Sequence, residues 1–229
     1  MTPTKRSILA AVVATSAFGS AAVAFPFTRS WHEPAAGAAG TNRAGAGGLY
    51  GTGGRTDHGL KCAHCHTGGA GQIGVTIAAQ PPFQTVNGDA AYRPAQRYTI
   101  TVTMTGEHRG SAASNQNGMA ATVEDASGRR AGRLVSDAGQ DAAACPTANP
   151  YPNAASLPAG RTTFMYGDCH GVLPLPRPGL TAWVFDWVAP GAGAGDLTLF
   201  LGVVDGDTGG GSSTGDDTVD RALPLREGT

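Results

Sequence analysis

Two cysteines and a histidine in one short stretch have the types and spacing for cofactor chemistry. Residues 61–66 are Lys-Cys-Ala-His-Cys-His, so Cys62, Cys65 and His66 form the pattern C-x-x-C-H. This pattern is the one by which haem is attached covalently, because two thiols on one side of a short turn can each add to a vinyl group of the porphyrin. The imidazole that follows can bind the iron as its proximal ligand. The motif predicts one covalent haem c per chain.

The same cysteine pair also fits two other structures. Cys62 and Cys65 could form a tight disulfide, or could supply half of a zinc site completed by Cys145, Cys169 or a histidine. A zinc site usually repeats its close pair of cysteines, whereas Cys145 and Cys169 are far apart in the sequence. Haem is therefore the favoured interpretation, with the disulfide and the zinc site kept as alternatives.

The N-terminus has the features of a secretory signal. Lys5 and Arg6 supply the positive charge, residues 8–18 form an apolar run, and Ala22-Val23-Ala24 is a small-residue cleavage site. A membrane anchor is the competing interpretation, but the run is short for a span and polar residues follow at once. We therefore expect an exported protein, periplasmic or at the cell surface, with no membrane span in the mature chain. Export places the cysteines in an oxidising compartment.

Composition excludes one class of partner and favours a loop-rich fold. The 229 residues carry a net charge of −1 and only 14% are charged, so nothing suggests binding to nucleic acid. The chain has 35 glycines and 15 prolines, which indicate many turns. We divide it into a signal peptide (1–24), a Gly/Ala-rich linker expected to be disordered (25–49), a haem-attachment loop (50–73) and a β-domain (74–229).

Alternation of apolar and polar residues after residue 74 predicts strands. Residues 97–105 alternate without a break, residues 180–188 place three aromatic side chains on one face, and residues 197–203 alternate equally cleanly. Shorter strands are expected at 75–78, 119–124, 129–135, 162–166 and 222–225, with a hairpin turn at 125–128 and a flexible acidic loop at 205–217. Seven or eight strands without a convincing helix predict an all-β sandwich.

Four stretches of the chain resemble a known family. They are Gly59–Gly68 with the C-x-x-C-H motif, Tyr92–Val102, Trp183–Pro190 and Thr214–Asp216. Together they resemble the Reelin-domain-like exported bacterial proteins called choice-of-anchor V domain proteins, over roughly residues 50 to 225. The resemblance implies an immunoglobulin-like (Reeler-like) β-sandwich without a settled activity. Met119 stands where the family usually has an aromatic residue, and the final residues match no sorting tail, so the resemblance implies no mode of anchoring.

Haem iron needs a second axial ligand or an open position. We select His170 as a tentative distal ligand, because it follows Cys169 in the place where the related sequences carry a histidine before their tryptophan strand. The other candidates are His108, His58, Met104, Met119 and Met165. Met104 and Met119 fall on apolar strand faces, where a core methionine is commoner than a ligand. The leftover pair Cys145 and Cys169 is expected to form a disulfide.

The sequence thus predicts an exported monohaem c-type cytochrome domain that transfers single electrons to an unknown redox partner protein. The alternative is a structural or adhesive β-sandwich module in which Cys62 and Cys65 form a disulfide or a metal pair. An enzyme with an open iron position, such as a small peroxidase, ranks last because no acid-base constellation accompanies the motif. Oligomeric state does not follow from the sequence.

Overall fold

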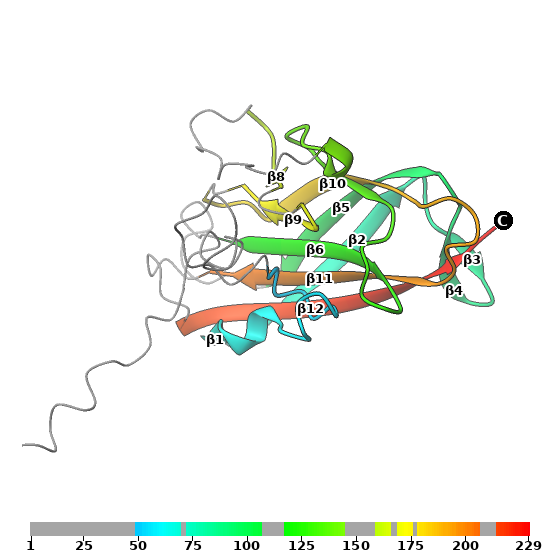
Figure 1. The fold of residues 1–229 in the computed structure, drawn as a ribbon. Coiled ribbons are helices and arrows are strands. Elements are labelled where there is room, and N and C mark those ends of the chain that lie inside the picture. The colour runs from blue at the N-terminus through cyan, green and yellow to red at the C-terminus, as the bar shows by residue number, and fades with distance from the viewer. Residues whose placement is uncertain are drawn as a thin grey trace, which may run out of the picture.

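The structure is a computed structural model that describes residues 49–69, 72–106, 117–144, 159–165, 169–175, 178–206 and 214–229. The predicted signal peptide and nearly all of the predicted linker lie outside these ranges. The described residues form two β-sheets packed face to face (Figure 1). The predicted fold class, an all-β sandwich, is therefore confirmed. No helix within the described ranges is long and apolar enough to cross a membrane.

The larger sheet has the strand order β3-β4-β12-β11-β6-β9-β8, with the short β1 paired alongside β12. The smaller sheet has the order β2-β5-β10-β7. The strands of the larger sheet are β1 (Thr67–Gly68), β3 (Gln84–Val86), β4 (Asp89–Tyr92), β6 (Gly118–Asp125), β8 (Thr163–Phe164), β9 (Gly171–Pro174), β11 (Leu197–Asp205) and β12 (Thr214–Glu227). Those of the smaller sheet are β2 (Ile73–Gln80), β5 (Arg97–Gly106), β7 (Arg133–Ser136) and β10 (Ala182–Val188).

The core lies between the two sheets and is built by the alternation that the sequence shows. Strands β5 and β10 pair in antiparallel register, with Trp183 opposite Val102 and Trp187 opposite Tyr98. The apolar residues of both strands are buried against those of β6, β11 and β12. Tyr98 stacks on Trp187 with ring centroids 5.8 Å apart. Because each such aromatic side chain removes a large apolar area from water, this face supplies much of the burial that stabilises the sandwich.

Several elements differ from the sequence prediction. The hairpin β3–β4 is an addition to the predicted strands. Asn87 and Gly88 form its turn, and both have positive φ. The predicted hairpin turn at 125–128 is present, because Asp125 and Ala131 pair with Arg129 and Val123 through backbone hydrogen bonds. The pairing ends there, and the continuation of the predicted strand, β7, pairs with β10 in the other sheet. Strand β12 begins at Thr214, inside the stretch expected to be a flexible acidic loop, and pairs with β11 along its length.

A third layer covers part of the larger sheet. Residues 49–69, here called the covering segment, lie on the outer face of β6, β11 and β12, away from the core (Figure 1). Tyr50 packs there in a second apolar cluster, with Ala120 of β6, Phe164 of β8, and Leu173 and Leu175 at β9. The predicted haem-attachment loop is thus packed against the sandwich.

Candidate functional site

The first half of the covering segment (residues 50–57, the inner half) is organised by a buried carboxylate. Asp57 is fully buried and accepts hydrogen bonds from the backbone N–H of Tyr50 at 2.7 Å and of Thr52 at 2.6 Å. The Thr52 hydroxyl also donates to Asp57 at 2.6 Å and lies 3.2 Å from the Thr122 hydroxyl on β6. The Asp57 carboxylate therefore holds the inner half in a closed turn. Thr52 connects that turn to β6.

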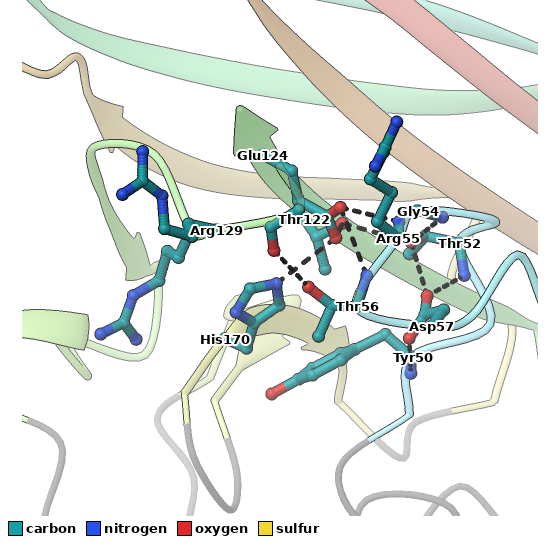
Figure 2. Close-up of polar contacts among 12 residues, drawn as sticks. Tyr50, Thr52, Gly54, Arg55, Thr56, Asp57, Thr122, Glu124, Arg129 and His170 are labelled. Carbon is teal, nitrogen blue, oxygen red and sulfur yellow. Dashed lines mark hydrogen bonds and ion pairs between the residues drawn. The ribbon is translucent and has the colours of Figure 1, made fainter. Parts of the chain in front are cut away.

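A second buried carboxylate attaches the inner half from the sheet side. Glu124 of β6 accepts hydrogen bonds from the backbone N–H of Arg55 at 2.8 Å and of Thr56 at 3.4 Å. Its other oxygen lies 3.4 Å from Nε2 of His170 (Figure 2). Gly54 permits this approach, because a Cβ there would lie 2.5 Å from Oε1 of Glu124. The chain comes this close to the carboxylate only because it has no side chain at that point.

Asp57 of the inner half and Glu124 of β6 have opposite pKa shifts. Burial raises the pKa of Asp57, and its hydrogen bonds from Thr52 and Tyr50 offset only part of that effect. Burial also acts to raise the pKa of Glu124, but hydrogen bonds from His170, Thr56 and the Arg55 N–H outweigh it and lower the pKa overall. Glu124 is therefore held as an anion, which suits an acceptor of several N–H groups.

The second half of the covering segment (residues 62–69, the turn half) carries the C-x-x-C-H motif. Cys62–His64 form a single turn of 3-10 helix, η1, in which the N–H groups of Cys65 and His66 bond back to the Cys62 carbonyl. Such a turn brings residues three apart onto one side. Cys62 and Cys65 are both free thiols. The motif therefore forms a tight turn, and haem attachment on it stays a prediction.

The Cys62 side chain is turned toward the sheet. Its sulfur lies 3.4 Å from the Gly51 carbonyl oxygen, and a Cβ on Gly202 of β11 would lie 2.6 Å from it. Burial raises the pKa of the Cys62 thiol, and the nearby carboxylates of Asp220 and Asp57 raise it further. Gly51 and Gly202 thus form a slot that holds Cys62 as a neutral thiol.

His66 faces a carboxylate from the far end of the chain. Its Nδ1–H donates to Oδ2 of Asp216 at 2.6 Å, a short, charge-assisted distance. The strand pairing fixes both residues, because β1 runs parallel to β12 with Gly68 opposite Asp216, and the Gly69 N–H donates to the Asp216 carbonyl. The Asp216 side chain is 3% exposed and that of His66 is 26% exposed. Asp216 thus holds the imidazole ring of His66 at Nδ1, and the ring is partly exposed to solvent.

The structure does not bring His170 to His66. His170 precedes β9, whereas Asp216, the partner of His66, lies on β12, and β11 and β6 stand between these strands. Three strand spacings correspond to about 14 Å. The Nε2 atom of His170, one of the two nitrogens that could bind iron, also faces Glu124. In this arrangement the two histidines do not share one iron.

The structure also shows where most of the other candidate iron ligands lie. Met104, Met119 and Met165 are buried in the core between the sheets, so they face away from the motif. His58 is exposed in the covering segment, and His108 lies outside the described residues. Cys169 is disulfide-bonded, and its predicted partner Cys145 lies outside the described residues. Within the described ranges, no three His, Cys, Asp or Glu residues are grouped to hold a metal ion.

Two carboxylates of this region were not predicted from the sequence. Asp216 belongs to a run of aspartates that was interpreted as a solvated loop, and it lies 150 residues from His66. Glu124 occupies an outward position on β6, where alternation predicts contact with solvent. The available signal for Glu124 was a charge directly after the apolar run 119–123, which Thr122 alone interrupts.

Comparisons with known proteins give a likeness of fold. No protein-family model matches the chain, and no curated protein matches it in sequence. The crystal structure of the human F-spondin reeler domain (fragment 1) is 15% identical, covers 71% of this chain and 92% of that chain, and has a TM-score of 0.41. The Reelin-N domain of F-spondin is 15% identical, with coverages of 71% and 91% and a TM-score of 0.39. Membership of the bacterial family stays a prediction.

Proposed function

We propose that this chain is an exported β-sandwich domain that carries one haem c on Cys62, Cys65 and His66 and transfers single electrons. The observation that carries the proposal is the orientation of His66. Asp216 holds Nδ1 by a 2.6 Å hydrogen bond, so Nε2 is the nitrogen left for iron. Histidines that bind metals almost always donate their other N–H to a carboxylate or carbonyl in this way. The bound iron would supply the one-electron chemistry, cycling between Fe(III) and Fe(II).

The two cysteines fit the attachment chemistry in type and spacing. Each thiol S–H adds across one vinyl C=C bond, the sulfur bonding to one carbon and the hydrogen to the other, so attachment needs no oxidant. Cys62 and Cys65 are free, as this addition requires. Cys62 must turn about its Cα–Cβ bond, out of the slot formed by Gly51 and Gly202. Leaving the slot costs a weak sulfur hydrogen bond and local packing, which formation of a covalent bond readily offsets.

The mass and the visible spectrum of the full chain test the proposal. Produced in a bacterial host with a c-type haem maturation system, the wild-type chain should gain the mass of one haem and keep its colour after denaturation and acid extraction. The matched double variant Cys62→Ala/Cys65→Ala should have the polypeptide mass alone. A wild-type chain of polypeptide mass, purified from that host or from the natural organism, contradicts the proposal.

A second candidate function is a structural or adhesive module of the periplasm or cell surface. It is favoured by the inward position of Cys62, whose neutral thiol fills the slot as a packing residue. In this case the covering segment serves to seal the outer face of the larger sheet. A colourless wild-type chain supports this candidate, particularly if Cys62→Ala lowers the free energy of unfolding by about 1 kcal/mol through lost packing. A red wild-type chain contradicts it.

A further inference from the structure

Asp216 is held rigidly against the ring of His66 by backbone pairing on both sides. The β1–β12 bridge places Gly68 opposite Asp216, two residues after His66, and the Gly69 N–H donates to the Asp216 carbonyl at 3.1 Å. The parallel pairing of β1 and β12 is visible in Figure 1. The Asp216 side chain is almost fully buried while the imidazole is partly exposed. Backbone pairing therefore places the two side chains beside each other, and burial leaves the Asp216 carboxylate little room to turn away.

This contact determines which nitrogen of His66 carries the proton. A carboxylate only accepts hydrogen bonds, so Nδ1 must donate, and neutral His66 has its bare lone pair on Nε2. A carboxylate on the far nitrogen also raises the basicity of the ligating nitrogen. More electron density at the iron favours Fe(III) over Fe(II), and the reduction potential falls. Both consequences follow from one 2.6 Å contact.

We propose that Asp216 is a positioning residue that fixes the tautomer of His66 and lowers the reduction potential of the iron bound to it. The inference rests on the proposed haem function and adds the identity of the residue that tunes it. The C-x-x-C-H pattern does not itself require an acidic partner for its histidine. The effect on the reduction potential therefore comes from Asp216 of β12. The protein would thereby favour low-potential donors and acceptors.

The first test compares midpoint potentials of the full haem-loaded chain. Asp216→Asn keeps the size of the side chain and removes its charge, and it should shift the Fe(III)/Fe(II) equilibrium about tenfold toward Fe(II), which is about +59 mV for a one-electron couple. The matched control is Glu124→Gln, which alters the other histidine-carboxylate pair and should leave the potential unchanged. Equal potentials for wild type and Asp216→Asn overturn the inference and leave the haem function standing.

The second test needs neither a variant nor haem. The ring-nitrogen chemical shifts of 15N-histidine-labelled, haem-free wild-type chain, recorded at alkaline pH so that the imidazole is neutral and with His66 assigned through His66→Gln, should show a protonated Nδ1 and a bare Nε2. A bare Nδ1 overturns the inference even if Asp216→Asn fails to fold. A wild-type chain that takes up no haem overturns the proposed function and the effect on potential together, whereas the tautomer result still decides whether Asp216 orients the ring.

Discussion

Each half of the covering segment lies against the larger sheet beside an imidazole-carboxylate contact, and the two contacts differ in depth and geometry. In the turn half, His66 uses Nδ1 at 2.6 Å and its side chain is 26% exposed. At the inner half, His170 uses Nε2 at 3.4 Å, and its side chain is 11% exposed against a fully buried Glu124. The first contact leaves a nitrogen free to bind a ligand from solvent, and the second contributes to a polar core. The same two chemical groups, an imidazole and a carboxylate, thus orient the His66 ring in the turn half and help to attach the inner half to the sheet.

Removing each imidazole should separate these two roles most sharply. His66→Ala removes the proximal ligand, so the spectrum of histidine-ligated haem should be lost completely. His170→Ala should retain the spectrum and instead lose about 1 to 2 kcal/mol of unfolding free energy, because Glu124 loses a buried donor. The ratio of haem absorbance to protein and a urea titration measure the two effects. Loss of the spectrum in His170→Ala would contradict the division of roles.

Removing the buried carboxylate of the inner half should have the largest effect on stability. Glu124→Ala leaves the Arg55 N–H and the His170 ring without their acceptor, which should cost about 3 kcal/mol. Glu124→Gln retains one acceptor oxygen and should cost roughly 1 kcal/mol. Urea unfolding measures both. An alanine variant as stable as the glutamine variant would show that these hydrogen bonds do not fasten the inner half.

Filling the slot beneath the motif should push the Cys62 side chain out of it. In Gly202→Ala the new Cβ would lie 2.6 Å from the Cys62 sulfur and 2.9 Å from the Gly51 oxygen, an overpacking that costs about 1 to 2 kcal/mol. Cys62 should be pushed outward and be alkylated faster, as followed by mass spectrometry of the haem-free chain. The matched control is Gly118→Ala on β6, where a Cβ makes only an ordinary 3.7 Å contact. Unchanged alkylation in Gly202→Ala would contradict the inward position of the thiol.

Acidification should produce the smallest effect, through the two buried carboxylates Glu124 and Asp57. The pKa of Glu124 is lowered below its ordinary value of 4.5, so its contribution to stability is present at neutral pH and is lost as pH falls through the lowered pKa. The raised pKa of Asp57 acts with the opposite sign, so its contribution is complete at low pH and is lost as pH rises through the raised pKa. The difference in unfolding free energy between wild type and Glu124→Gln isolates Glu124. That difference should shrink below pH 4.5, and a constant difference down to acid pH would contradict the lowered pKa.

The sequence predicted the elements whose local pattern decides their structure. Strands β5 and β10 alternate strictly, and burial of one face leaves only one register for them. The C-x-x-C-H turn is equally local. Strand β12 was predicted at its end only, because its aspartates favour a loop by composition, and pairing with β11 overrides that preference.

The long-range part of the site could not be predicted in the same way. Alternation correctly places Glu124 away from the core, but it does not show that a glycine-rich segment without periodicity will cover it. The partners of His66 and His170 lie 150 and 46 residues away in sequence. Such contacts form only when the complete fold has brought these distant residues together, and no short stretch of the sequence specifies them.

The distance along the chain between the motif and β12 has a consequence for the order of events during synthesis. The motif leaves the ribosome well before Gly202 and Asp216 are made, and chains are synthesised from the N-terminus. Until the last two strands arrive, Cys62 has no slot to enter and His66 has no carboxylate to meet. On the proposed haem function, a maturation enzyme would therefore meet both thiols before the slot and the carboxylate have formed around them.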